Sequence, residues 1–469
     1  MRKQLILLTA STSLLAGCAT NLAPVHERPA LPTASEYPAE FANDKEPGKR
    51  ATEIGWKSFF ADDRLEVLVK QALERNRDLA VAVAQIEEAR GLYRIQDANR
   101  LPTLGASGEA SRSRTPETLT GTGSSITSNR FSVGVGVTSF EIDFWGKVKN
   151  QSEAARSQYL ATEAAAKAFR LALIRDVAST YFAAREADER IKLAEATVKS
   201  RKDGLRIAKR RLDVGVTSAL DYRQSEALLT QAETELAALK LSKAQSDNYM
   251  AVLTGGPVAG PLPAGLTLAQ QMQMPALSAG LPSDLMVARP DIIASEEQLR
   301  AARANIGAAR AAFYPSISLT GSLGLASTAL DSLIGTDGLS WSFGPSISLP
   351  IFDGGRNKAN LSVAEARENI AVASYERTVQ GAFREVADAL AGRRYLAEEV
   401  ASQKRALEAN RQIARLARLR YREGVSNYLE VLDAERNLFA AEQGLIQLQR
   451  LQADNLASLY VALGGGQFE

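Results

Sequence analysis

The sequence contains the same turn twice, 209 positions apart. In Tyr421–Asp433 it reads Tyr-Arg-Glu-Gly-Val-Ser-Asn-Tyr-Leu-Glu-Val-Leu-Asp, and a near copy lies earlier in the chain. The matching pairs are Gly215 and Gly424, Val216 and Val425, Leu220 and Leu429, Asp221 and Glu430, and Glu226 and Glu435. The offset still holds where Thr254-Gly255-Gly256 matches Leu463-Gly464-Gly465. A constant offset indicates a duplicated structural unit, so we expect two helical hairpins with equivalent tips.

Proline placement marks the regions that can form long helices. All 16 prolines lie outside 117–256 and 351–469, and both regions are rich in good helix formers. Apolar residues recur there at spacings of three and four, close to coiled-coil spacing. They are Ile174, Val177, Tyr181, Ala184, Ala187, Ile191, Ala194 and Val198 in the first region, and Val379, Phe383, Val386 and Leu390 in the second. A helix from Gly146 to Arg211 would be about 100 Å long, which argues against several ordinary globular domains. The return helices are expected at 218–254 and 427–463.

Each repeat is predicted to begin with a shorter helix and a pair of strands. The helices are expected at Arg64–Asn99 and Asp291–Phe313, each ended by a proline, Pro102 or Pro315. Apolar residues then alternate with Ser, Gly and Thr, as in Phe131–Thr138, which predicts strands with one apolar face. The four strands are expected at about 103–114, 131–143, 316–326 and 340–351.

Two interpretations of these strands remain open on the pattern alone. One is a soluble half-buried sheet, and the other is a membrane barrel with lipid outside and water inside. The connecting segments 115–130 and 327–339 are polar or rich in Gly and Ser, as outward loops would be. Four strands cannot close a transmembrane barrel, and open edges are not tolerated in lipid. The membrane interpretation therefore requires several chains to share one barrel.

The N-terminus has the pattern of a lipoprotein signal peptide. Arg2 and Lys3 precede a short apolar run that ends in Leu15-Ala16-Gly17-Cys18. This tetrad resembles the bacterial lipoprotein box, although an ordinary signal with an incidental cysteine has the same outline. We expect residues 1–17 to be removed and Cys18 to carry a covalent lipid such as palmitate. Ala19 favours the outer membrane, and 18–60 is expected to be a lipid-anchored extension that is rich in proline up to residue 50.

Composition excludes several classes of function. Cys18 is the only cysteine and His26 the only histidine, which argues against a His/Cys metal site or a histidine-based catalytic triad. The chain has 56 basic and 54 acidic residues, so no nucleic-acid-binding surface is implied. We therefore expect neither an enzyme nor a cofactor beyond the lipid.

Several long strings resemble the outer-membrane efflux channels of the TolC type, in their lipoprotein (NodT/OprM-like) branch. The strings are Trp56…Phe59…Asp62…Leu65, Ala72-Leu73…Asn76…Asp78-Leu79, Arg289-Pro290-Asp291-Ile292, Asn305–Ile317 and Pro350–Arg356. The resemblance implies a homotrimer with a 12-stranded β-barrel, continued by a long α-helical barrel in the periplasm. The repeats would be 61–256 and 284–469, joined by a linker at 257–283.

The resemblance gives the duplicated turns a role as a periplasmic gate. By position, Asp221, Tyr421, Glu430 and Asp433 match the constriction residues of the family. Threefold symmetry would bring like carboxylates together, where they repel one another and attract cations. Alternatively, they are acids in an exposed first helical turn. Ser426 replaces the gate arginine of the family's best-known member, so Arg420 and Arg422 are candidate ion-pair partners or simply solvated charges.

The turns also resemble the docking tips for a periplasmic adaptor, or membrane fusion protein. The tip residues are Val214, Gly215, Val216 and Thr217, and Gly424, Val425 and Ser426. A glycine at each helix C-cap is equally explained by its backbone freedom. The implied function is the exit duct of a tripartite drug or solute efflux system driven by an inner-membrane RND pump. The alternatives are a channel for type I protein secretion and a periplasmic coiled-coil scaffold without a pore.

Overall fold

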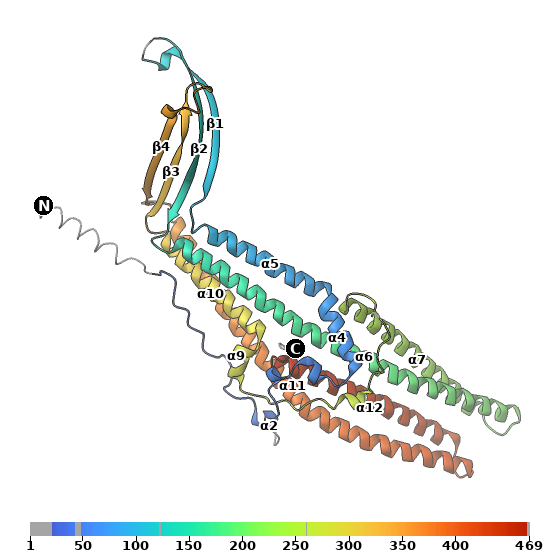
Figure 1. The fold of residues 1–469 in the computed structure, drawn as a ribbon. Helices are drawn as coiled ribbons and strands as arrows, with labels where there is room; N and C mark the ends of the chain where they lie inside the picture. The colour runs from blue at the N-terminus through green and yellow to red at the C-terminus, as the bar shows by residue number, and fades with distance from the viewer. Residues whose placement is uncertain (1–20, 43–47, 122, 259, 467–469) are drawn as a thin grey trace. The chain divides into compact units, whose positions relative to one another are not determined.

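Two helices of equal length dominate the computed structural model of the chain (Figure 1). Residues 21–42, 48–121, 123–258 and 260–466 are described. Helix α6 covers Lys147–Asp213 and α11 covers Arg356–Arg422, each with 67 residues. Their return helices, α7 at Ala219–Leu253 and α12 at Tyr428–Ala462, have 35 residues each. Every one of these boundaries keeps the offset of 209, so the predicted duplication and the predicted long hairpins are confirmed.

Apolar side chains at the predicted spacings form the buried faces of the long helices. Ile174 and Val177 on α6 and Leu390 on α11 are fully buried. Ala184 and Ile191 on α6 and Phe383 on α11 are only half-buried. Burial of such a stripe, rather than helix propensity alone, stabilises helices of this length.

The chain divides into two compact units. The first contains residues up to Pro29, Gln85–Glu163 and Ala294–Tyr375, and the second contains Ala30–Ala84, Ala164–Ile293 and Glu376–Glu469. The other α-helices are α2 (Ala39–Ala42), α3 (Trp56–Phe59), α4 (Asp63–Arg75), α5 (Arg77–Ala98), α8 (Leu268–Gln271), α9 (Leu285–Ala288) and α10 (Pro290–Ala311). Short 3-10 helices cover Ala51–Glu53, Glu117–Leu119, Pro282–Asp284 and Thr336–Gly338.

The first unit contains one antiparallel sheet in the order β1-β2-β3-β4 (Figure 1). Its strands are β1 (Leu104–Thr115), β2 (Ile126–Ile142), β3 (Ser316–Ser327) and β4 (Leu339–Ser348). All four predicted strands are present. Strand β2 starts five residues earlier than predicted, since Ile126–Arg130 extends the pairing with β1. Strand β4 ends at Ser348 instead of residue 351.

Cross-strand pairing collects apolar side chains on one face of the sheet. Val133 faces Leu325 and Val135 faces Leu323, while Gly134 faces Gly324 on the other side of the pleat. The two strands approach closely there, because a Cβ added at Gly134 would lie 2.8 Å from the Leu323 carbonyl oxygen. A bulge interrupts β2 between Val137 and Phe140, with Ser139 at φ 55°. The apolar face stays exposed within one chain.

The first predicted helix is broken, which corrects the expectation of one helix over Arg64–Asn99. Helix α4 ends at Arg75 and α5 begins at Arg77, with Asn76 in an extended conformation at ψ 130°. The Asn76 side chain accepts a hydrogen bond from the Leu79 N–H at 2.8 Å and so caps α5. It also donates to the Leu253 carbonyl at 2.9 Å. A cap and a distant acceptor together favour the break.

The N-terminal segment lies on other parts of the chain. In the first unit, Arg28 pairs with the buried Glu296 at 2.8 Å and Arg310 donates to the Leu22 carbonyl at 3.2 Å. In the second unit, Tyr37 is buried and stacks on Phe383 with 5.2 Å between ring centres. The described part of the predicted proline-rich extension therefore packs against helices, α10 in the first unit and α11 in the second. Cys18 and the predicted signal 1–17 lie outside the described residues.

The second unit shows the duplication again in its packing. Phe59 stacks on Tyr460 with ring centres 4.0 Å apart, and both are buried. Gly255 and Gly464, equivalent residues just beyond α7 and α12, both have positive φ. A Cβ at Gly255 would lie 2.1 Å from the Arg75 carbonyl oxygen, and one at Gly464 would lie 2.5 Å from that of Ala288. The return helices therefore end against the shorter helices in the same way in both repeats.

Candidate functional site

The two helical turns in the second unit have the same backbone geometry. Gly215 and Gly424 have φ angles of 72° and 76°. The Val216 N–H donates to the Arg211 carbonyl at 2.8 Å, and the Val425 N–H donates to the Arg420 carbonyl at 3.0 Å. This six-residue closure is the Schellman arrangement that ends many helices. A Cβ added at either glycine meets nothing within 4 Å, so the positive φ, not crowding, selects glycine there.

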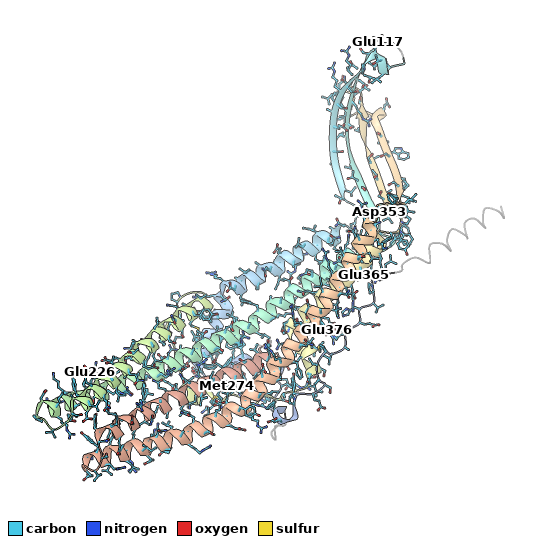
Figure 2. All side chains as sticks on the ribbon, turned by 180° about the vertical axis from the view of Figure 1, so that it is seen from behind. Glu117, Glu226, Met274, Asp353, Glu365 and Glu376 are labelled. Carbon is cyan, nitrogen blue, oxygen red and sulfur yellow. The ribbon has the colours of Figure 1, made fainter. Side chains whose placement is uncertain are left out.

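Apolar side chains at the tips are exposed in the single chain. They are Val214, Val216, Leu220, Val425 and Leu429. Thr217 and Ser426, which the sequence also placed at the tips, are half-buried. Figure 2 labels Glu226, which lies on α7 a short way from the first turn. An apolar cluster on an exposed turn is typical of a surface that binds another protein.

The first tip holds its carboxylate through local hydrogen bonds. Ser218 caps α7 by accepting from the Asp221 N–H at 3.2 Å. The Thr217 hydroxyl donates to the Asp221 carboxylate at 2.6 Å. This bond, with smaller contributions from Ser218 and Arg211, lowers the pKa of Asp221. Asp221 therefore keeps its negative charge while it is fixed to its own turn.

At the second tip, the two carboxylates form ion pairs with different arginines. Asn427 caps α12 by accepting from the Glu430 N–H at 3.2 Å. Glu430 pairs with Arg420 at 3.6 Å, whereas Asp433 pairs with Arg436 at 2.9 Å on its own helix. Within the described residues, no ion pair includes Arg422. Of the two arginines suggested by the sequence, only Arg420 therefore lies beside a candidate gate carboxylate.

Tyr421 joins the two hairpins. Arg211 on α6 donates a hydrogen bond to its hydroxyl, with the guanidinium 5.3 Å from the ring centre. Tyr428 lies against the same ring, with 5.0 Å between ring centres. Both tyrosines contact an apolar cluster that consists of Ala414, Ala417, Val431 and Ala434. The sequence did not identify Arg211 or Tyr428 as partners of Tyr421. The repeat relates Arg211 to Arg420, 209 positions later, but it carries no signal for the contact between Arg211 and Tyr421.

A second set of charges connects the hairpins farther from the tips. Arg450 on α12 pairs with Glu186 on α6 at 2.6 Å, and Arg190 pairs with the same carboxylate at 2.8 Å. Arg190 also binds Glu235 on α7 at 2.8 Å. Asp454 lies next to Arg450 and bonds to it, yet burial raises the pKa of Asp454 to about 6. We call Glu186, Arg190, Glu235, Arg450 and Asp454 the inter-hairpin charge cluster.

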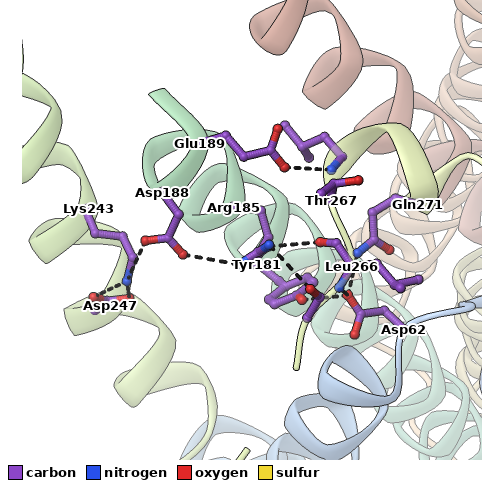
Figure 3. A network of polar contacts seen from close by, with 12 residues as sticks. Asp62, Tyr181, Arg185, Asp188, Glu189, Lys243, Asp247, Leu266, Thr267 and Gln271 are labelled. Atoms are coloured by element: carbon purple, nitrogen blue, oxygen red, sulfur yellow. Dashed lines mark hydrogen bonds and ion pairs between the residues drawn. The ribbon is translucent and has the colours of Figure 1, made fainter. Parts of the chain in front are cut away.

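The linker between the repeats is held by a buried carboxylate, Asp62 (Figure 3). One Asp62 oxygen caps α4 through the Arg64 N–H at 2.9 Å. The other accepts from the Tyr181 hydroxyl at 2.6 Å, from the Leu266 N–H at 2.9 Å and from the Gln271 amide. The network fixes the linker on α6. In the sequence, Asp62 stood out only as part of the string Trp56…Phe59…Asp62…Leu65, which resembles the family.

No group of three or more His, Cys, Asp or Glu residues in the described ranges could hold a metal ion. None of the helices described is both long and apolar enough to cross a membrane.

Comparison with known proteins gives the family. A family model described as "Outer membrane efflux protein" matches residues 68–256 and 281–465. The chain is 41% identical over 456 residues to the solvent efflux pump outer membrane protein SrpC of Pseudomonas putida, covering 97% of this chain and 96% of that one. It is 40% identical over 453 residues to the cation efflux system protein CusC of Escherichia coli K12, covering 96% and 97%.

Solved structures agree with this result over nearly the whole chain. The open state of the Neisseria gonorrhoeae MtrE outer membrane channel matches with a TM-score of 0.87 and 40% identity, covering 96% of this chain and 99% of that one. The Campylobacter jejuni CmeC outer membrane channel matches with a TM-score of 0.87 and 28% identity, covering 96% of both. The chain therefore belongs to the outer membrane efflux protein family and is an outer-membrane efflux channel.

Proposed function

We propose that this chain, as a homotrimer, is the passive exit duct of a tripartite RND-type system that exports drugs or other small toxic solutes. One observation carries the proposal. Among the described residues, no strand pairs with the outer edge of β1 or of β4, and the apolar face of the sheet is exposed. Lipid does not tolerate unpaired strand edges. Three copies with four strands each would close a barrel of 12 strands, and the long helices would continue it into the periplasm.

The substrate class is inferred from the range of the relatives. Those reported above are named for the efflux of solvents and of cations, and another similar protein, ArpC of Pseudomonas putida, is named an antibiotic efflux pump outer membrane protein. The same type of channel thus belongs to systems named for very different solutes, which favours a duct that selects little by chemistry. We therefore assign substrate choice and energy supply to an inner-membrane RND pump, and contact with a periplasmic adaptor to the exposed turns.

The lipid anchor at Cys18 is a separate part of the proposal. The described chain begins only three residues later, at Asn21, and Leu22 is already bound by Arg310. A lipid on Cys18 would therefore be held close to the first unit. Palmitate labelling of wild type and Cys18→Ser tests this, and label that persists in the variant would refute the anchor. Some efflux should remain in Cys18→Ser, because the barrel itself also stays in the membrane.

Complementation tests the duct. The chain is expressed with its pump and adaptor in a bacterial strain that lacks its own outer-membrane channel, and ethidium efflux is measured. We expect restored efflux and, by light scattering in mild detergent, a trimer. A monomer without channel conductance would support the scaffold alternative. Export of a protein substrate without small-solute efflux would support type I secretion instead.

A further inference from the structure

The string Pro350–Arg356 forms the turn between β4 and α11, at the foot of the sheet (Figure 2). Asp353 caps α11 by accepting from the Gly355 N–H at 2.9 Å and the Asn357 N–H at 2.8 Å. Gly354 and Gly355 both have positive φ. Asp353 and the two glycines therefore have a structural role in the turn. The side chains of Ile351 and Phe352 take no part in these hydrogen bonds. Arg356 contributes to the turn through its backbone N–H and its charge, which help the Asn357 N–H to lower the pKa of Asp353.

A small cavity lies beside this turn, within the first unit. It has a volume of about 160 Å³ and is lined from both repeats by Glu141, Asp143, Trp145, Lys147, Tyr314 and Arg356, among others. Sites that enclose a whole small ligand usually measure about 300–1,000 Å³. This cavity can therefore hold only the end of a larger molecule.

Two acidic and two basic side chains line the cavity, and Arg356 is the basic one that forms no ion pair among the described residues. Lys147 pairs with Glu141 at 3.0 Å, and Asp143 caps α6 through the Lys149 N–H at 2.7 Å. No ion pair of Arg356 occurs in the part of the chain that the structure describes. Lys147 and Arg356 are equivalent residues of the two repeats, the first of α6 and the first of α11. A cation is unfavourable at the start of a helix, so helix stability does not explain either residue.

Apolar and aromatic side chains surround the cavity. Ile351 is 95% exposed and Phe352 is 91% exposed. The exposed apolar residues Ile347 and Leu349 lead into this turn from β4. Trp145 stacks on Tyr314 with 4.6 Å between ring centres, and its indole N–H donates to the Pro315 carbonyl at 2.8 Å. Paired aromatics beside exposed apolar residues are typical of the level where a membrane protein meets lipid headgroups.

We propose that this cavity binds the headgroup phosphate of a glycerophospholipid at Arg356, while the acyl chains lie on Ile351 and Phe352. The ligand fits in size, because only its headgroup enters the cavity. It fits in charge, because one phosphodiester anion complements one unpaired guanidinium. It also fits in position, because the apolar residues continue the outer face of the sheet. The inference rests on the proposed function, in which that sheet lies in the outer membrane.

Native mass spectrometry of the purified trimer in detergent tests the site. The protein is titrated with dioleoylphosphatidylethanolamine and, separately, with dioleoylglycerol, which lacks the phosphate. We expect one tightly bound phospholipid per chain, and binding of dioleoylglycerol at least tenfold weaker. Arg356→Gln should weaken phospholipid binding at least tenfold, and Arg356→Lys should restore most of it.

Lys358→Gln is the matched control, since it removes the same charge from an exposed residue of the same helical turn outside the cavity. It should change the affinity less than twofold. Equal affinity of wild type and Arg356→Gln, or equal binding of dioleoylglycerol, would overturn the lipid site. Failure of the proposed function would look different, because wild type would then form no trimer and no conducting channel. If Arg356→Gln does not assemble, Phe352→Ser tests the acyl contact, and unchanged phospholipid affinity there would also overturn the proposal.

Discussion

Arg211, on the first helical hairpin, donates a hydrogen bond to the hydroxyl of Tyr421 on the second and lies over its ring. Its equivalent in the second repeat, Arg420, turns to Glu430 instead. The same residue of the duplicated turn thus joins the two hairpins in one repeat and stays within a single hairpin in the other. The two tips are therefore not equivalent in what holds them.

Arg211→Ala should raise the resting conductance of the channel. The change removes a hydrogen bond and a cation–π contact, together about 1–3 kcal/mol, and a shift of 1.4 kcal/mol changes an equilibrium tenfold. Single-channel recording in planar bilayers measures it. Arg223→Ala is the control, because Arg223 lies over Tyr222 and pairs with Glu226 within one helix. Equal conductance of Arg211→Ala and wild type would show that Arg211 does not stabilise the closed state of the channel.

Glu430→Gln and Asp433→Asn should separate gating from ion selectivity. Glu430 ties α12 to α11 through Arg420, whereas Asp433 pairs along its own helix. We expect both variants to reduce cation preference, since rings of carboxylates select cations. Only Glu430→Gln should raise conductance, and modestly, because an exposed pair contributes about 0–1 kcal/mol. The double variant removes six carboxylates from a trimer, and a lower conductance there would mean that repulsion had kept the ring open.

Side chains added at the tips should prevent adaptor binding without unfolding the turns. Asn tolerates positive φ, whereas Val at such a position costs about 1–2 kcal/mol. Gly215→Asn/Gly424→Asn should therefore keep the apparent melting temperature and lose adaptor binding and efflux, while the Val pair loses both stability and binding. Adaptor binding is measured by surface plasmon resonance. Normal binding of the Asn pair would place adaptor contact elsewhere.

The inter-hairpin charge cluster should make the protein more stable in mild acid. The folded-state pKa of Asp454 is raised to about 6 from 3.8, so the folded chain keeps a proton that the unfolded chain has lost. The contribution of this proton to the free energy of unfolding is complete below about pH 4. It is lost as the pH rises through 6, and the loss is at most about 3 kcal/mol. The apparent melting temperature should fall between pH 5 and pH 7.5. Asp454→Asn should reduce that difference, and an unchanged pH dependence in the variant would contradict the assignment.

Asp62→Ala should destabilise the second unit strongly. It leaves buried donors of Tyr181, Leu266 and Gln271 without their acceptor, at about 1–3 kcal/mol for each unsatisfied group. Tyr181→Phe removes one hydrogen bond and should lose only about 1 kcal/mol. Thermal unfolding followed by circular dichroism measures both. Asp63→Ala, at an exposed neighbouring residue, serves as the control. An equally large loss of stability in that variant would mean that the effect comes from the N-terminus of α4 and not from the hydrogen-bond network.

Local pattern was sufficient for the regular elements of this fold. Proline placement and apolar spacing predicted α6 within two residues of its observed ends and a second long helix in the region of α11, and the repeat predicted both turns. Each of these features depends on residues close in sequence. The break at Asn76 was missed because its favourable acceptor, the carbonyl of Leu253, is 177 positions away.

The contacts at the candidate site were predictable only in part. The family resemblance had suggested Glu430 and Arg420, which form an ion pair across a single turn. Arg420 and Arg422 were both candidate partners for the gate carboxylates, but Asp433 pairs with Arg436, one turn along its own helix. The link from Arg211 to Tyr421 depends on how one hairpin lies against the other, and no spacing within either hairpin encodes that.

The equal lengths of α6 and α11 restrict how this sequence can evolve. One residue inserted into a single long helix would advance its tip by about 1.5 Å and rotate it by about 100°. The two turns would then stand at different heights, and Arg211 would no longer face Tyr421. Insertions and deletions in the long helices should therefore survive only as matched pairs, one per repeat, whereas the segments between strands are free to drift independently. The length of each long helix is therefore constrained by the length of the other, and neither repeat can change it alone.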